Sequence, residues 1–330
     1  MRYYALATLL AALLALAAAC GGGSGSTPTP SATELVATPV TAVFDCEGVT
    51  RTTAPEVEAF PVEVADSVGN IVNLDAPPQR IVSLSAGHTE ILYAIGAGDQ
   101  VAAVDNTSDC PSVLAEFPKV DAFTPNVEQI AALEPDLVVI FFDPGDLQSS
   151  LHGLGIPVLN LAAPESVDGV YDQMALLGEA TGHSTDAEGV AGGMKEAVAD
   201  VLSQVQDAAE APTVFHEVDN LYFSAGSGTF IGDLYAMLGA ENIADATGQA
   251  YPQLSAEAII QADPDVIVLA DEDAGETPET VKARPGWESI AAVKNDRVYV
   301  IDPDIISRPG PRLVEALRTL AGYLYPGLVP

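Results

Sequence analysis

The chain has 330 residues, a length typical of about two domains. Its 12 Lys and Arg residues against 47 Asp and Glu residues give a formal net charge of −35. A field of that sign repels a phosphate backbone, which excludes nucleic acid as a binding partner. No run of like charges is long enough to form a tail, so we interpret the acidity as a solvated surface.

The N-terminus has the pattern of an export signal. Arg2 precedes an apolar run that ends at Ala19, too short to span a membrane comfortably, and we assign residues 1–19 to a signal peptide. The sequence Ala-Ala-Ala-Cys at 17–20 resembles a bacterial lipobox, which predicts cleavage before Cys20 and a lipid on its thiol. An ordinary signal peptide is the alternative. Residues 20–59, rich in Gly, Ser, Thr and Pro at their start, are predicted to be the lipid anchor and a flexible linker.

Two further cysteines, Cys46 and Cys110, form an even pair. Outside the cytoplasm such a pair favours a disulfide, which would pin the segment before the first lobe to the Ser108–Pro111 loop. The sequence does not give the distance between them, so two free thiols are the alternative.

The next residues predict two α/β regions with a helical connection. Residues 60–165 begin with a hairpin and continue as strands alternating with short helices, the pattern of a parallel sheet. Residues 166–210 contain helix formers and no strand signal. Their glycines at 189, 192 and 193 each destabilise a helix interior by up to about 1 kcal/mol, which favours a helix break there. Residues 211–330 return to the alternating pattern.

One phrase occurs in both α/β regions. The run Glu128–Ile140 has a short helix, Pro-Asp and an apolar strand, and the run Glu257–Leu269 repeats it in the same register. A proline ends each helix, and a fully apolar strand is typical of a buried parallel sheet. The fold class we predict is therefore α/β: two Rossmann-like lobes with parallel sheets, joined by one long backbone helix, with a ligand cleft between the lobes.

The chain lacks the motifs of common enzymes and metal sites. It contains no His-Glu-x-x-His, no cysteine pair with zinc spacing, no Gly-x-Ser-x-Gly and no phosphate loop ending in Lys-Ser/Thr. We predict no enzyme activity, no cofactor and no direct metal site. The turn at 226–229 opens a helix and has two interpretations, an anion site on backbone N–H groups or a simple turn.

Aromatic residues are few, yet several lie where strands and helices meet. In a parallel α/β sheet, ligands collect beyond the carboxyl ends of the strands. As a set these rings are typical of walls for a large, flat, partly apolar ligand, although each one taken singly could belong to the core. The residues are Phe123, Phe141, Phe142, Tyr222, Phe223 and Tyr251.

Glu128 and Glu257 occupy matching positions in the two repeats. Asn126 and Ser255 stand two residues earlier and are good N-caps, which places each glutamate in a first helical turn. The helix dipole stabilises a carboxylate there by about 0.3–1 kcal/mol, and this alone accounts for both residues. The functional alternative is a pair of acidic knobs that bind arginines on a two-fold symmetric partner.

Four motifs across residues 60–326 resemble the ABC-importer solute-binding proteins for cobalamin, ferric siderophores and haem. They are Pro78–Leu84, Asn126–Ile130, Tyr251–Glu257 and Ser307–Leu313. The resemblance implies modest closure on binding and docking of Glu128 and Glu257 onto permease arginines. It also implies a monomer that serves a permease dimer with its cytoplasmic ATPase. The location it implies is the outer face of a bacterial membrane or the periplasm.

Within that family the chain looks closest to the cobalamin binders. Tyr251 stands where those proteins often have a tryptophan, and Phe123, Phe141 and the Thr107–Asp109 loop fall at other corrin-contacting positions. The one tryptophan, Trp287, is outside these positions, which leaves a ferric siderophore open, with Arg308 as partner for an anionic chelate. The ligand we expect is a metal-containing corrinoid or an iron chelate, and haem and molybdate-type oxyanions are weaker options. A lipid-anchored enzyme or adhesion module on the same fold is the rival from another class.

The resemblance and the aromatic pattern together define the predicted ligand contacts. They are Thr107, Asp109, Phe123, Phe141, Phe142, Tyr222, Phe223, Tyr251 and Arg308.

Overall fold

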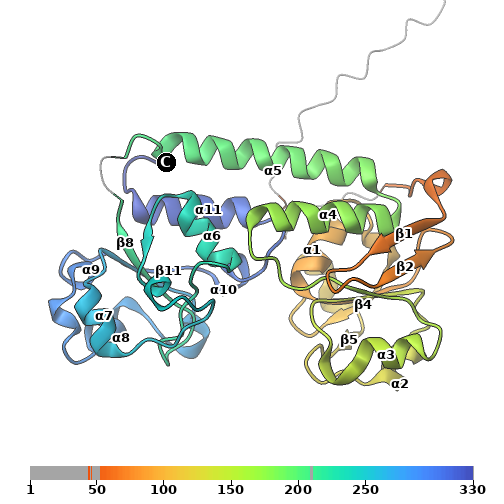
Figure 1. Ribbon diagram of the computed structural model, residues 1–330, viewed down its shortest axis with the longest axis horizontal. Helices are drawn as coiled ribbons and strands as arrows, with labels where there is room; N and C mark the ends of the chain where they lie inside the picture. Colours follow the sequence, from red (N-terminus) through yellow and green to blue (C-terminus); the bar gives the residue numbers. More distant parts are fainter. Residues whose placement is uncertain (1–43, 45, 47–52, 209–210, 330) are drawn as a thin grey trace, which may run out of the picture. The chain divides into compact units, whose positions relative to one another are not determined.

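The computed structural model describes residues 44, 46, 53–208 and 211–329 (Figure 1). The predicted signal peptide, the lipidation site at Cys20 and the linker up to residue 52 lie outside the described residues, apart from positions 44 and 46. Residues 53–59, which we assigned to the end of the linker, contact the first lobe: Thr53 N donates to Gly96 O. In this part of the chain no helix combines the length and the apolar character needed to cross a membrane.

Lobe 1, residues 60–165, contains a hairpin and a five-stranded sheet. Strands β1 (Val62–Ala65) and β2 (Ile71–Leu74) pair antiparallel, as the alternation at 60–75 predicts. The sheet is parallel throughout, with the order β5-β4-β3-β6-β7. Its strands are β3 (Ile81–Leu84), β4 (Val101–Asp105), β5 (Lys119–Val120), β6 (Leu137–Ile140) and β7 (Val158–Asn160).

Three helices belong to lobe 1: α1 (Ala86–Ala94), α2 (Val127–Ala132) and α3 (Leu147–His152). Helix α1 begins where Ser85 accepts a hydrogen bond from His88 N, and the chain leaves it through Gly96 at φ 90°. A left-handed backbone of that kind favours glycine.

The chain also contains short 3₁₀ turns among the described residues. They are Val57–Ala59, Gly98–Gln100, Ser112–Glu116, Pro144–Asp146, Ile243–Thr247, Glu272–Ala274 and Trp287–Ser289.

Two helices connect the lobes: α4 (Val167–Thr181) and the long α5 (Ser184–Val205). The predicted break at residues 189–193 is wrong, because α5 runs through these glycines without interruption. The break lies earlier, at Gly182, which closes α4 at φ 80°. Gly189 and Gly192 face open space, and the buried side of α5, including Met194 and Val198, holds the helix in place.

Lobe 2, described over residues 211–329, repeats the α/β plan with a four-stranded parallel sheet of order β11-β10-β8-β9. Its strands are β8 (Thr213–Glu217), β9 (Glu241–Asn242), β10 (Val266–Leu269) and β11 (Val298–Val300). Its helices are α6 (Phe230–Met237), α7 (Ala256–Ala262), α8 (Pro278–Lys282), α9 (Ala291–Lys294), α10 (Pro303–Ile306) and α11 (Leu313–Leu324).

The repeated phrase has the same structural role in each lobe. Helix α2 leads to β6 and α7 leads to β10, and the aspartate after each proline ties down the start of a neighbouring strand. Asp136 accepts hydrogen bonds from Gln79 N and Arg80 N, just before β3, and Asp265 accepts one from Thr213 N at the start of β8. The prediction of two similar α/β lobes with parallel sheets and a long connecting helix is confirmed.

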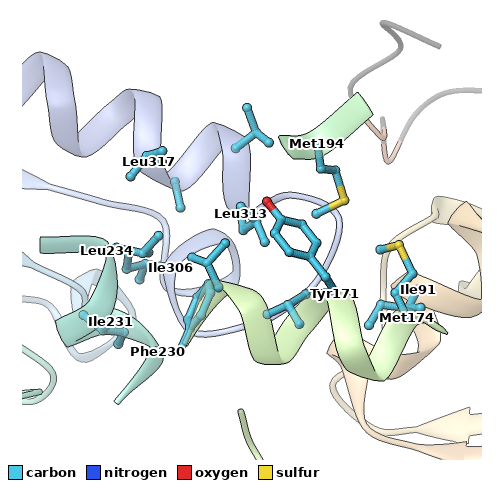
Figure 2. Close-up of a cluster of buried hydrophobic side chains, with 14 of the residues drawn as sticks. Ile91, Tyr171, Met174, Met194, Phe230, Ile231, Leu234, Ile306, Leu313 and Leu317 are labelled. Atoms are coloured by element: carbon cyan, nitrogen blue, oxygen red, sulfur yellow. The ribbon is translucent and has the colours of Figure 1, made fainter. Parts of the chain in front are cut away.

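One apolar core runs from lobe 1 through the connecting helices into lobe 2. Figure 2 shows Ile91 of α1 beside Met174 of α4, with Met194 of α5 and Leu313 of α11 in the same cluster. Helix α5 packs against both α4 and α11, as Figure 1 shows. Because interiors of this kind are close-packed, the core restricts how far one lobe can move against the other.

Candidate ligand-binding site

An aromatic cluster follows the carboxyl ends of strands β5 and β6 in lobe 1. The Phe123 ring centroid lies 6.0 Å from that of Phe141 and 5.6 Å from that of Phe142, and the last two are 4.5 Å apart. Phe123 is 66% exposed. An exposed ring supported by two others is an apolar surface that a flat ligand can stack on. We call these three residues the aromatic wall.

The carboxyl end of lobe 2 has a different character. Tyr222, which follows β8, adopts φ 67°, and its ring lies 5.7 Å from that of Trp287. The guanidinium of Arg284 lies 5.1 Å from the Tyr222 ring and 4.5 Å from the Trp287 ring. A cation at these distances attracts both rings. The sequence placed Trp287 outside the site, whereas the structure puts it directly behind a predicted ligand contact.

Arg284 is held by an acidic cluster that the sequence analysis did not predict. Its Nη1 and Nη2 donate to both oxygens of Glu217, at 2.6 and 2.5 Å, and Nη2 also donates to Glu276 Oε2 at 2.7 Å. Glu217 is fully buried at the end of β8. Burial raises the pKa of Glu217, and Arg284 offsets part of that rise.

Asp271 completes the acidic cluster just after β10. Its carboxyl is buried, and neither oxygen has a donor among the described residues. Burial, followed by the charges of Glu217 and Glu276, raises the pKa of Asp271 to about 7. When Asp271 is protonated, its O–H donates a hydrogen bond to the Glu217 carboxylate. When Asp271 is ionised, two carboxylates face each other with no hydrogen between them, which is unfavourable. We call Glu217, Asp271, Glu276 and Arg284 the acid–arginine cluster.

Three predicted contacts, Thr107, Asp109 and Arg308, meet each other across the two lobes. Arg308 Nη1 donates to Asp109 Oδ1 at 2.6 Å, and Arg308 Nη2 donates to Thr107 O at 2.9 Å. The segment after β11 in lobe 2 therefore touches the loop after β4 in lobe 1. Arg308 also pairs with Asp304 at 2.6 Å, so several oxygens already surround its guanidinium.

The remaining predicted contacts, Phe223 and Tyr251, lie on two segments of lobe 2 that pair with each other. Tyr251 is 57% exposed, and the backbone of Phe223 bridges to Gln253. Phe223 is half-buried and Tyr251 is exposed. With Tyr222 they form the aromatic set of lobe 2, in the part of the repeat that corresponds to the aromatic wall of lobe 1. The structure thus gathers the predicted contacts into one set for each lobe and one set between the lobes.

Glu128 and Glu257 are both exposed in the first turns of α2 and α7. The N-caps act as predicted: Asn126 accepts from Gln129 N at 2.9 Å and Ser255 accepts from Ala258 N at 3.1 Å. Within the described part of the chain neither glutamate has an ion pair or a side-chain hydrogen bond. Both carboxylates are therefore free to bind an outside cation.

Cys46 and Cys110 form a disulfide, with their Cα atoms 4.9 Å apart. The bond attaches a residue of the N-terminal segment directly beside Asp109. Of the two alternatives that the sequence left open, the structure contains the bonded one.

The 226–229 turn holds a side chain of the protein in place of an outside anion. Ser227 N donates to Asp245 Oδ1 at 2.6 Å, and Thr229 caps α6 by accepting from Gly232 N. This arrangement favours the simple turn over the anion site.

A solvent-open hollow of about 810 Å³ has none of the predicted ligand contacts in its lining, which does include Asp143, the residue after Phe142. It lies in lobe 1 between the β1–β2 hairpin and α3, and its lining includes Asn70, Asp143, His152 and Ile156. No aromatic ring other than the imidazole of His152 lines it. The hollow therefore lacks the aromatic surface that we expect a flat ligand to use.

Residues 81–305 match the family of periplasmic binding proteins. This match covers more than half of the chain, and the chain belongs to that family. Its members are binding proteins and not enzymes. The alternative of a lipid-anchored enzyme on the same fold is therefore excluded. The matches identify the chain as an ABC transporter substrate-binding protein, which implies permease and ATPase partners and a place outside the cytoplasm.

The chain is similar to an uncharacterized ABC transporter substrate-binding lipoprotein, YvrC, of Bacillus subtilis. The two are 35% identical over 280 residues, which are 82% of this chain and 88% of that protein. A cobalamin-binding protein of Halobacterium salinarum is 30% identical over 80% of this chain and 74% of its own length.

Among solved structures, the periplasmic vitamin B12 binding protein BtuF of Vibrio cholerae matches with a TM-score of 0.66 and 26% identity. The match covers 75% of this chain and 97% of that one. Solved haem-binding proteins share the fold as well. The fold alone therefore does not specify the ligand.

Proposed function

We propose that this protein captures a cobalamin-type corrinoid outside the cytoplasm and delivers it to the permease of an ABC importer. The observation that carries the proposal is the combination of an exposed aromatic wall with a site whose arginines are already neutralised. A corrinoid is large and flat, and its ring carries uncharged amide groups. Such a ligand needs apolar stacking and polar partners, and it does not need a free cation.

The positive charges of the protein are nearly all engaged. The chain has 12 Lys and Arg residues, of which Arg2 and Arg51 lie outside the described residues. Of the others, only Arg318 on α11 has neither a hydrogen-bond acceptor nor an aromatic partner in the described part of the chain. Arg284 and Arg308, which lie at the carboxyl ends of the strands, each bind at least two carboxylates.

This charge distribution disfavours anionic chelates. Haem carries two carboxylates, and many ferric siderophores carry net negative charge, so each needs arginines or lysines that are free to pair with it. Here such a ligand would have to displace Asp109 from Arg308 or Glu276 from Arg284. The cobalamin-binding relative from Halobacterium salinarum and the vitamin B12 binding protein from Vibrio cholerae support the same choice of ligand.

Calorimetric titration of the purified protein with cyanocobalamin, haem and an anionic ferric catecholate siderophore tests the proposal. We expect cyanocobalamin to bind with a Kd of about 1 μM or tighter, a binding free energy of about −8 kcal/mol. Haem and the siderophore should bind at least about tenfold more weakly. Tighter binding of either one would replace the corrinoid with that ligand.

The same proposal includes a lipid anchor at Cys20 and docking through Glu128 and Glu257. The substitution Cys20→Ser should release the protein from the membrane fraction into the soluble extracellular or periplasmic fraction. If the variant stays with the membrane as the wild type does, the anchor is elsewhere. This fractionation does not depend on the identity of the ligand.

A further inference from the structure

Two arginines of one lobe 2 segment join the lobes. Arg308 and Arg312 flank the turn between α10 and α11, and both bind oxygens of lobe 1. Arg312 binds Glu90 on α1, and Arg308 binds Glu90 and the loop that carries Asp109. Both arginines contact the buried Glu90, but only Arg308 also pairs with an exposed residue of lobe 1, Asp109. We therefore divide the contact between the lobes into a buried inner part and an exposed outer part.

The inner part is the pair between Glu90 and Arg312. Arg312 Nε lies 2.9 Å from Glu90 Oε2, and Nη2 lies 2.6 Å from Oε1, a bidentate pair in which both side chains are buried. Burial raises the pKa of Glu90, and the two arginines offset part of that rise. Separating a buried pair leaves each charge without a partner in a poorly solvated place, which is costly. This pair therefore stays formed.

The backbone holds the inner part together as well. A Cβ atom on Gly87 would lie 2.9 Å from the carbonyl oxygen of Pro309, so α1 and the turn of lobe 2 approach too closely for a side chain. Ile91 and Leu313, the residues after Glu90 and Arg312 in the chain, belong to the apolar core shown in Figure 2. Ion pair, backbone and core together form a pivot that opening leaves intact.

The outer part is the contact of Arg308 with the Thr107–Asp109 loop. The Arg308–Asp109 pair measures 2.6 Å, but the Asp109 side chain is 66% exposed. Water can replace a carboxylate at such a position, so an exposed pair is broken at low cost. Arg308 keeps Asp304, a partner in its own lobe, when Asp109 leaves. Opening therefore exposes no unpaired arginine.

The loop that presents Asp109 is held on both sides. Asp105, at the end of β4, accepts hydrogen bonds from Thr107 N at 3.1 Å and from Ser108 Oγ. On the other side, Cys110 is bonded to Cys46. Because this loop is held in place, Asp109 loses little conformational entropy when it pairs with Arg308, and the contact is favoured.

We propose that Asp109 and Arg308 form a clasp that holds the two lobes at their close spacing in the ligand-free protein, around the pivot at Glu90 and Arg312. The clasp consists of one exposed charge pair and the hydrogen bond from Arg308 to Thr107 O. Both contacts are weak enough to break on opening, and salt screens the charge pair. The proposal depends on the two-lobed fold and not on the identity of the ligand.

Spin-label distance measurements on the ligand-free full chain test the clasp. Cysteines introduced at the exposed residues Ser150 on α3 and Glu279 on α8 carry the labels, in a Cys20→Ser background. We expect Asp109→Asn to raise the population with a wider lobe spacing about fivefold, which corresponds to roughly 1 kcal/mol. Sodium chloride at 1 M should shift the wild type in the same direction.

Asp304→Asn is the matched control. It removes one carboxylate from the same guanidinium and changes the charge equally, but its partner is within lobe 2. It should leave the spacing of the wild type unchanged. Unaltered distances in Asp109→Asn would overturn the clasp, and so would equal widening in both variants, because the effect would then come from the placement of Arg308 within its own lobe. Since no ligand is present, neither outcome bears on the corrinoid proposal.

Discussion

The two lobes are alike where we expect the permease and different where we expect the ligand. Helices α2 and α7 each begin with a capped turn that exposes one glutamate, Glu128 or Glu257, with no ion-pair partner among the described residues. At the carboxyl ends of the sheets, lobe 1 has the aromatic wall and lobe 2 has the acid–arginine cluster. The repeat therefore preserves its strand and helix plan while the residues at the carboxyl ends diverge.

The difference separates two kinds of recognition. Matched charges on matched helices suit a partner with two-fold symmetry, because one patch on each half of the partner meets the same feature. A corrinoid has no such symmetry, so unlike walls suit it better. We infer that docking onto the permease uses the glutamates that the two lobes share. Ligand selection uses the aromatic wall and the acid–arginine cluster, in which the lobes differ.

Removing both shared glutamates should have the largest effect. In Glu128→Ala/Glu257→Ala we expect uptake through the cognate permease to fall to near background, and each single variant to fall less, because rim charges guide association with a partner. Ligand affinity of the purified variant should stay within about twofold of the wild type, because neither carboxylate belongs to the ligand contacts.

Glu63→Ala/Glu279→Ala provides the matched control for that experiment. It removes one exposed glutamate from each lobe, away from α2 and α7, and should leave uptake unchanged. If the docking glutamates only stabilise their helices, the double variant would transport normally and lose about 1–2 kcal/mol of unfolding free energy. Uptake and thermal unfolding measured on the same variant distinguish these outcomes.

The aromatic residues should give the next largest effect. Truncation of a central aromatic anchor commonly costs about 2 kcal/mol, a loss of about thirtyfold in affinity. We expect Phe123→Ala and Tyr251→Ala each to weaken corrinoid binding by that order in calorimetric titrations. Both side chains are mostly exposed, so the fold should survive. Leu154→Ala, an exposed apolar control in lobe 1, should bind normally, and unchanged affinity in both aromatic variants would contradict the site.

Asp271 should make lobe 2 sensitive to pH. Its pKa is raised from 3.8 to about 7, so the folded protein holds a proton that the unfolded chain releases. The stabilising contribution is fully present below about pH 4 and is lost as pH rises to about 7. In Asp271→Asn, the free energy of unfolding relative to wild type should rise by up to about 1.4 kcal/mol per pH unit in that window.

Denaturant titrations of both proteins between pH 4 and 8 measure this difference. Comparison with the wild type cancels the contributions of His88 and His216, which are buried and have pKa values lowered to about 4. A difference that does not change with pH would show that Asp271 is ionised throughout.

The sequence predicts those parts of the molecule whose signals are local. The Pro-Asp phrases predict β6 and β10, and the N-caps at Asn126 and Ser255 predict the starts of α2 and α7, because each depends on residues a few positions apart. The same local rules misplaced the break in the connecting helices. Gly182 ends α4 because its backbone is left-handed. The glycines within α5 do not end that helix, because the buried side chains on its opposite face stabilise the helical conformation.

The charged parts of the site could not be predicted, because their partners are far apart in the chain. Glu90 and Arg312 are separated by 222 positions, and Arg284 and Glu217 by 67. No periodicity or motif links such residues, and only the packed fold brings them together. The sequence identified Arg308 as a partner for an anion, and the structure shows that Asp109 and Asp304 already occupy it.

The central claim is that the site accepts a flat ligand without negative charge and disfavours an anionic one, since carboxylates of the protein already neutralise its arginines. Calorimetric titration with cyanocobalamin and with corrinoids whose ring amides are hydrolysed to carboxylates tests this most directly, because the ring is kept and only the charge changes. We predict that affinity falls with each added carboxylate, by at least about tenfold for the most charged form, a difference of about 1.4 kcal/mol. Equal or tighter binding of the carboxylate forms would contradict the account.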